Sequence, residues 1–249
     1  MGFSLEELRE KLCSIKNMGF VPTHRRGNTG IGKTLEDLLG IEENNLKIGD
    51  FGIFELKATR IDASTPITLF TKEPSRPKIG WKKIIKQYGY IDKKGRSALK
   101  FGITYGSANS FKGWYSEIDS ANERINLKRE DEILAYWDFD VIESPISIKM
   151  SNTVFVDAER KIVNGREHFW YNSATLAKGI SLDGLLKLIR SSHIEIHLRL
   201  HLKENGSVRN RGTAFRIKEK FIPELYDELL SLLDNCGASM ASTSLDEFF

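Results

Sequence analysis

The sequence of 249 residues has little of what marks secreted, membrane-spanning or metal-rich proteins. Its only cysteines, Cys13 and Cys236, lie far apart without the spacing of a metal site, which predicts free thiols. No apolar run approaches about 18 residues, the length that spans a bilayer. The first nine residues contain acids and no apolar segment, so a signal peptide is not expected. We therefore expect a cytoplasmic protein that does not cross a membrane.

The sequence also has little excess charge of either sign. The 37 Lys and Arg residues nearly balance the 34 Asp and Glu residues, and the net charge of +3 is too small to indicate nucleic-acid binding by itself. The excess is unevenly distributed, because residues 235–249 hold two acids and no base and residues 221–234 add four acids without a base. Residues 1–220 therefore carry +9.

The hydrophobic pattern predicts a mixed α/β fold. A content of 40% hydrophobic and 29% charged residues is typical of globular proteins and excludes wholesale disorder. Helical spacing of apolar side chains and capping residues predict helices over residues 5–17, 35–39, 81–88, 182–189 and 221–233. Strands are expected over residues 51–59, 67–71, 153–158, 167–171, 193–202 and 213–217.

The stretch from Gly27 to Thr34 fits the Gly-x-x-x-x-Gly-Lys-Thr pattern of a nucleotide-binding loop. That loop needs a buried strand directly before its first glycine, whereas residues 22–26 contain a proline and two arginines. No later apolar run ends in an aspartate suited to holding Mg²⁺ in such a fold. We therefore favour a basic loop at the start of a helix, with Lys33 near a DNA phosphate, over a nucleotide hydrolase.

The most informative segment runs from Asp50 to Lys57. Strand alternation puts Glu55 and Lys57 on one face, and a bend before the strand would bring the Asp50 carboxylate beside that of Glu55. Two carboxylates suit a hard cation such as Mg²⁺, and an adjacent lysine would orient a water and offset charge in phosphodiester hydrolysis. A metal-dependent nuclease is one interpretation; a surface strand with an ordinary Glu–Lys pair is the other.

A further carboxylate can be selected by helix geometry. Leu35, Leu38 and Leu39 define the buried arc of the second helix. Glu36 borders this arc and Asp37 points away from it, so Glu36 is the better candidate to assist a metal site. A solvated helix acid is the alternative for Glu36.

Taken together, these segments resemble the MvaI/BcnI type II restriction endonucleases, relatives of MutH in the PD-(D/E)xK superfamily. The resemblance is dense over residues 20–75, returns at 172–174 and 195–218, and is weak between 90 and 150. It includes the loop pattern at Gly27, which this family carries without being an ATPase. The stretches that carry it are residues 27–34, 36–39, 50–51, 55–57, 68–72 and 212–217.

The resemblance implies a Mg²⁺-dependent endonuclease, with Mn²⁺ as a substitute, that cuts double-stranded DNA at a short C/G-rich site. Asp50, Glu55 and Lys57 fall on catalytic positions of the family, with Asp50 and Glu55 as metal ligands, and Glu36 falls on its accessory carboxylate. The implied fold is a monomeric PD-(D/E)xK core with a central mixed sheet flanked by helices. We expect one bilobed domain over residues 1–234, with a catalytic lobe mainly in 1–90 and a recognition lobe including 193–218.

The region from His193 to Lys220 reads as a basic hairpin, with seven Lys and Arg residues against three Glu. Arginine bonds guanine O6 and N7 bidentately, so Arg199 and Arg216 are the expected guanine readers, and both match G·C-reading positions of the similar enzymes. His197 matches another base-contacting position, where MvaI has Asp. Arg209 and Arg211 are expected on base edges or phosphates. Lys72, at the end of the family-like stretch 68–72, is a further expected DNA contact.

The C-terminal residues resemble a sliding-clamp-binding peptide. Leu245, Phe248 and Phe249 match its apolar positions, whereas Ser242 replaces its glutamine. A flexible tail over residues 235–249 that docks these side chains in a partner's pocket would favour a MutH-like repair endonuclease. An end that folds back onto the protein is the alternative.

Overall fold

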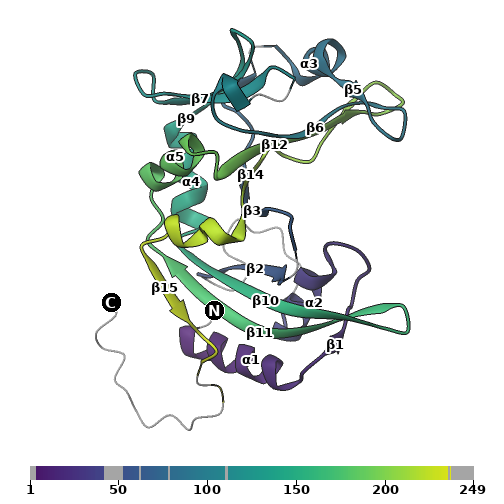
Figure 1. Cartoon of the computed structure of the whole chain (residues 1–249), viewed down its shortest axis with the longest axis vertical. Helices are drawn as coiled ribbons and strands as arrows, with labels where there is room; N and C mark the ends of the chain where they lie inside the picture. Colours follow the sequence, from purple (N-terminus) through teal and green to yellow (C-terminus); the bar gives the residue numbers. More distant parts are fainter. Residues whose placement is uncertain are drawn as a thin grey trace. The chain divides into compact units, whose positions relative to one another are not determined.

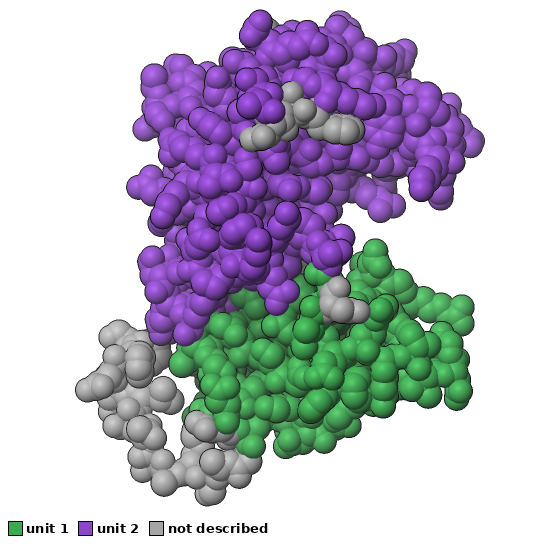
Figure 2. Space-filling view, in the orientation of Figure 1, with its two compact units in different colours: residues 1–63, 154–176, 230–249 green, residues 64–153, 177–229 purple. Residues whose placement is uncertain are grey.

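The computed structural model describes residues 4–41, 53–61, 63–77, 79–109, 112–234 and 236. The chain forms two compact units, which are coloured separately in Figure 2. Unit 1 comprises residues 1–63, 154–176 and 230–249, and unit 2 comprises residues 64–153 and 177–229. No described helix is long and apolar enough to cross a membrane.

Two helices begin unit 1. Helix α1 (Leu5–Asn17) starts with the predicted capping box, because the Glu7 amide donates to Ser4 Oγ at 3.1 Å and the Ser4 amide donates to Glu7 Oε2 at 2.7 Å. Helix α2 (Gly30–Leu39) ends at Gly40, whose φ of 76° suits a glycine. At the first residue of this helix only glycine fits, because a Cβ at Gly30 would meet the Arg25 carbonyl oxygen at 2.2 Å.

A five-stranded sheet supports these helices. Its order is β1-β11-β10-β2, with β15 also paired to β11 (Figure 1). The core lies on one face, where Leu12 of α1 and Leu35 of α2 pack in one cluster with Leu56 of β2. The strands are β1 (Val21–Pro22), β2 (Glu55–Arg60), β10 (Asn152–Val163), β11 (Arg166–Lys178) and β15 (Glu228–Ser231).

Unit 2 contains the other two sheets. The six-stranded sheet has the order β3-β14-β12-β6-β5, with β13 paired to β12, and the four-stranded sheet has the order β4-β9-β8-β7. Their strands are β3 (Ile67–Thr71), β4 (Arg76–Pro77), β5 (Tyr90–Ile91), β6 (Ser97–Ile103), β7 (Trp114–Asp119), β8 (Arg124–Arg129), β9 (Glu132–Asp138), β12 (Ile194–Leu202), β13 (Val208–Asn210) and β14 (Ala214–Ile217). The helices are α3 (Trp81–Tyr88), α4 (Phe139–Lys149) and α5 (Leu182–Arg190), with 3-10 turns η1 (Ser107–Asn109) and η2 (Glu219–Glu224).

The predicted mixed α/β class is confirmed, although the strands among the described residues form three sheets rather than one central sheet. The helix predicted over residues 221–233 is wrong: this segment forms the end of η2 and strand β15. Pairing of β15 with β11, continued by the Leu232 amide on the Ala174 carbonyl at 2.9 Å, satisfies the backbone instead.

The prediction of free thiols is also wrong. Cys13 of α1 and Cys236 form a disulfide with Cα atoms 5.3 Å apart, and both side chains pack against the core of unit 1. The sequence could not predict this pairing because the two cysteines are 223 residues apart. Only folding of the sheet brings the segment after β15 beside α1. The bond joins the two ends of the described chain within unit 1.

We expect Cys236→Ser to lower the free energy of unfolding by about 2 to 5 kcal/mol, and the melting temperature by roughly 5 to 15 °C. The loss arises because opening a link between residues 223 apart frees the unfolded chain. Thermal unfolding with and without dithiothreitol measures it; the reductant should destabilise the natural sequence and leave the variant unchanged. Two titratable thiols in the unreduced, unfolded protein would contradict the disulfide.

Candidate active site

Strand β2 separates an apolar from a polar face. Leu56 and Ala58 point into the core of unit 1, so the alternating residues Glu55, Lys57 and Thr59 lie on the opposite face. Glu55 is buried, and its Oε1 forms an ion pair with Lys57 Nζ. The structure therefore brings together two of the predicted catalytic residues in the predicted arrangement. Asp50, the third, lies outside the described residues.

Asp157 on β10 joins the same polar face. Thr59 Oγ1 donates to Asp157 Oδ1 at 2.5 Å, and Ser173 on β11 also bonds this carboxyl group. Burial raises the pKa of Asp157. The sequence analysis did not select Asp157, although the apolar alternation of Val154, Val156 and Ala158 assigns it to the face opposite the core.

Glu36 lies half-buried on α2, the helix that packs against β2. The structure thus places the helix of Glu36 against the strand of Glu55 and Lys57. A direct role for Glu36 beside Glu55 stays a prediction.

In the segment that matches the nucleotide-binding pattern, Lys33 and Thr34 form hydrogen bonds or ion pairs with neighbouring residues of unit 1. The Thr34 side chain is fully buried, and its Oγ1 accepts from the His24 amide at 2.9 Å. Lys33 Nζ lies 2.8 Å from Asp37 Oδ1, and hydrogen bonds from Lys33 and His24 lower the pKa of Asp37. The strand before the loop, β1, has only two residues. Lys33 and Thr34, the two side chains that a nucleotide-binding loop would use, thus contact neighbouring residues of the protein, and a DNA contact by Lys33 stays a prediction.

In unit 2, strand β12 carries a second polar row. His197 Nε2 lies 2.8 Å from Glu195 Oε2, and this hydrogen bond lowers the pKa of the Glu195 carboxyl group. Gly102 faces His197 from the neighbouring strand β6, where a Cβ would lie 2.6 Å from Glu195 Oε2 and 2.7 Å from His197 Nε2. Glycine at position 102 therefore leaves room for the pair. His197 was predicted from the sequence, whereas Glu195 was not selected and Gly102 has no local sequence signal.

Backbone carbonyl groups hold the two predicted guanine readers. Arg199 donates from Nε to the Gly212 carbonyl at 2.8 Å and from Nη2 to the Arg211 carbonyl at 2.6 Å. Arg216 donates from Nη2 to the Pro66 carbonyl, and its buried Nε has no hydrogen-bond partner among the described residues. Burial lowers the pKa of both guanidinium groups. The two side chains are thus partly desolvated and fixed in direction.

The other predicted DNA contacts occupy neighbouring strands or loops of unit 2. Lys72 follows β3, and its backbone is fixed by its amide on the Thr213 carbonyl at 2.9 Å and by Trp137 Nε1 on its own carbonyl at 3.0 Å. Arg209 on β13 and Arg211 after it are exposed. The six-stranded sheet and its loops therefore gather every predicted contact of unit 2, whereas Lys33 belongs to unit 1.

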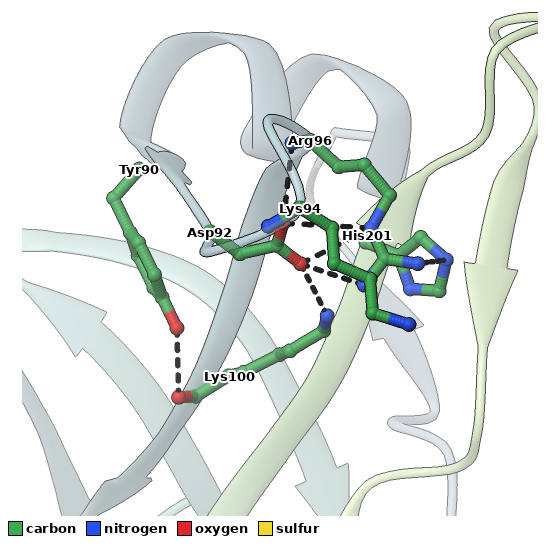
Figure 3. A network of polar contacts seen from close by, with 6 residues as sticks. All are labelled: Tyr90, Asp92, Lys94, Arg96, Lys100 and His201. Atoms are coloured by element: carbon green, nitrogen blue, oxygen red, sulfur yellow. Dashed lines mark hydrogen bonds and ion pairs between the residues drawn. The ribbon is translucent and has the colours of Figure 1, made fainter.

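A network of polar side chains links the β5–β6 turn of the six-stranded sheet to β12 (Figure 3). Asp92 Oδ2 accepts from Arg96 Nη2 at 2.8 Å and from Lys100 Nζ at 2.7 Å, which strongly lowers its pKa. Arg96 Nη1 lies 3.1 Å from Nε2 of His201 on β12, and burial lowers the pKa of His201. The network joins the β5–β6 turn to β12, on the two strands that also hold Gly102 and His197.

Known structures share the fold of this chain over nearly its whole length. The complex of restriction endonuclease MvaI with its cognate DNA substrate matches with a TM-score of 0.81 and 30% identity, covering 94% of this chain and 100% of the other. MvaI in the absence of DNA matches with a TM-score of 0.56 and 29% identity, covering 94% and 99%. A search of the curated proteins gave no match.

The mixed α/β fold of this chain is that of a type II site-specific endonuclease. A family model described as the MvaI/BcnI restriction endonuclease family matches residues 9–226. The chain belongs to this family.

We expect His197→Ala to raise the pKa of Glu195, because it removes the hydrogen bond that lowers this pKa most and leaves the burial that raises it. Carboxyl-carbon NMR titration measures the change, with His168→Ala on β11 as the matched control. A lowered pKa means that ionised Glu195 stabilises the folded protein above its unfolded titration range and loses this effect as pH falls through the folded pKa. An unchanged Glu195 titration in His197→Ala would contradict the pairing.

Proposed function

We propose that the chain is a Mg²⁺-dependent endonuclease that hydrolyses phosphodiester bonds of double-stranded DNA at a short C/G-rich site. The observation that carries the proposal is the buried Glu55 carboxylate, ion-paired with Lys57 on the polar face of β2. Similarity to the solved complex of MvaI with its cognate DNA supports duplex DNA as the substrate. We further propose a monomer with its catalytic lobe mainly in residues 1–90 and its recognition lobe including 193–218.

The donor set fits the proposed metal. Glu55 supplies a buried carboxylate, a hard oxygen ligand of the kind that Mg²⁺ prefers, and Asp50 is the proposed second ligand. When bound, Mg²⁺ or Mn²⁺ would polarise a phosphate oxygen and make a coordinated water more acidic. Glu36 is the proposed accessory carboxylate.

Lys57 supplies the positive charge that the reaction needs beside this carboxylate. Its ammonium group carries three donors, one directed to Glu55 Oε1, and the others would hold the attacking water and a phosphate oxygen. Both side chains are mostly buried, at 18% exposure for Lys57 and 10% for Glu55, so bulk water screens their interaction with the phosphate weakly. Thr59 and Asp157 extend this polar face along β2 and β10.

We expect Glu55→Gln and Lys57→Ala each to reduce DNA cleavage by about 10³-fold, because each removes charge that acts on the reacting phosphate. Initial rates on plasmid DNA with Mg²⁺, followed by mapping of the ends, measure the effect. Glu10→Gln, an exposed change on α1, is the matched control and should cut at the natural rate. Full activity in Glu55→Gln would refute the proposed active site.

Base reading is proposed for Arg199 and Arg216, with His197 at an adjacent base. The backbone carbonyls that hold both arginines leave the remaining guanidinium donors in a set direction, which suits bidentate bonds to guanine. Arg209, Arg211, Lys72 and Lys33 are proposed DNA contacts outside this pair.

Arg199→Ala and Arg216→Ala should lower the preference for the cognate site over a G·C-substituted site by about 10- to 100-fold, since each bidentate contact is worth roughly 1 to 3 kcal/mol. Arg209→Ala should weaken binding to the cognate and the substituted duplex equally. It should also reduce the slope of log K against log salt by about 1, the contribution of one phosphate contact. Competition binding without divalent metal separates the two patterns. A uniform loss of affinity in Arg199→Ala would assign it to the phosphates instead.

A clamp-linked repair endonuclease is the second candidate, favoured by the terminal sequence alone. Leu245, Phe248 and Phe249 lie outside the described residues, so clamp binding stays a prediction. Cutting confined to mismatch-bearing duplexes would favour repair, and unique fragments from fully paired DNA would favour restriction.

A further inference from the structure

Unit 1 contains a pocket of about 660 Å³ whose lining does not include Glu55 or Lys57. One wall is the loop between β1 and α2, and the other is the tip of the β10–β11 hairpin. The first wall comprises residues 23–27 and the second comprises residues 164–167. No role for this pocket follows from the proposed active site or from the base-reading strands.

The pocket is rich in positive charge. Arg25 and Arg26 line it from the loop and Arg166 lines it from the hairpin, and all three side chains are exposed. Its one acid, Glu167, is paired with Arg60 at 3.1 Å and with Arg160 at 3.5 Å. Such a lining favours an anion with several oxygen atoms.

Hydrogen bonds within and between the two walls fix their backbone. Thr23 Oγ1 donates to the Arg25 carbonyl at 2.7 Å, and Arg166 Nε donates to the Thr23 carbonyl at 3.0 Å, which ties the hairpin tip to the loop. Gly165 at the hairpin turn adopts a φ of 72°, which glycine allows. The pocket is therefore a formed feature of unit 1.

The pocket also has a direct link to the strand of Glu55 and Lys57. Arg60 Nη2 donates to the Gly27 carbonyl at 3.4 Å, and Arg60 follows Lys57 by three residues on β2. Three strand residues span about 10 Å. Because side chains alternate along a strand, Arg60 points to the face opposite Lys57, and it contacts the pocket from the last residue of β2. A duplex that extends from Lys57 past the end of β2 would carry one phosphate per about 3.4 Å of helix axis toward the pocket.

We propose that this pocket binds backbone phosphates of the DNA beside the cleavage site, through Arg25, Arg26 and Arg166; the assignment rests on the proposed function. The contacts position the duplex and carry no base preference. A free nucleoside triphosphate offers the same phosphate chemistry. The engagement of Thr34 with His24 and of Lys33 with Asp37 favours DNA as the source.

The test measures binding of a duplex of about 30 base pairs without divalent metal, over about 50 to 200 mM KCl. Arg25→Ala/Arg26→Ala should bind about 10-fold more weakly and lower the slope of log K against log salt by roughly 1 to 2. Arg25→Lys/Arg26→Lys should recover most of the slope, because it keeps the charge. Arg9→Ala, on α1 outside the pocket, is the matched control and should equal the natural sequence.

An unchanged slope and affinity in a double-alanine variant that melts at the natural temperature would overturn the proposal. A second contradicting result would be that the natural protein binds a labelled ATP analogue tightly and the double-alanine variant does not, while the slope of log K against log salt for DNA is the same in both. Cleavage assays with Mg²⁺ separate this inference from the proposed function. A reduced slope in a protein that does not cut DNA would keep the phosphate pocket and refute the endonuclease, whereas normal cutting with an unchanged slope would refute only the pocket.

Discussion

The register of β2 depends on the burial of Phe54 and Leu56 between the sheet and helices α1 and α2. Because side chains alternate along a strand, a slip of one residue would turn Glu55 and Lys57 into this core. Each buried apolar side chain contributes about 1.5 to 3 kcal/mol, and an inward-facing carboxylate would cost several kcal/mol more. The chemically active face is therefore fixed by the apolar residues that lie between its members.

The same constraint orders β12 in unit 2. Ile196 and Leu198 are at most 1% exposed, and they leave Glu195, His197 and Arg199 on the other face. The polar row then needs its own supports, which come from neighbouring strands and loops: Gly102 makes room for His197, and the Gly212 carbonyl holds Arg199. Hydrophobic burial chooses the face, whereas these local contacts choose the direction of each side chain.

Features that depend on local periodicity could be predicted from the sequence. Helix α1, helix α5 and strand β12 lie where apolar spacing and capping residues indicate, and the pairing of Glu55 with Lys57 follows from alternation alone. Features that depend on contacts between residues far apart in the sequence could not be predicted in this way. The apolar spacing around strand β15 fits a helix, and its actual partner β11 lies about fifty residues earlier, where local periodicity cannot reveal the pairing. The sequence around Cys13 likewise does not indicate that Cys236 is its disulfide partner. Asp157 and Gly102 also gain their positions from strands far away in sequence.

The interleaving of the two units bears on how such a protein can change its target. Unit 1 draws on three stretches of the chain and unit 2 on two, so neither is encoded by one continuous segment. An exchange of unit 2 between relatives would require two grafts, one joined to unit 1 after β2 and at β10, and the other joined at β11 and β15. Single substitutions on β12 and β14 alter the polar row without disturbing those junctions. Evolution of specificity in this architecture therefore proceeds more readily residue by residue than by recombination of whole modules.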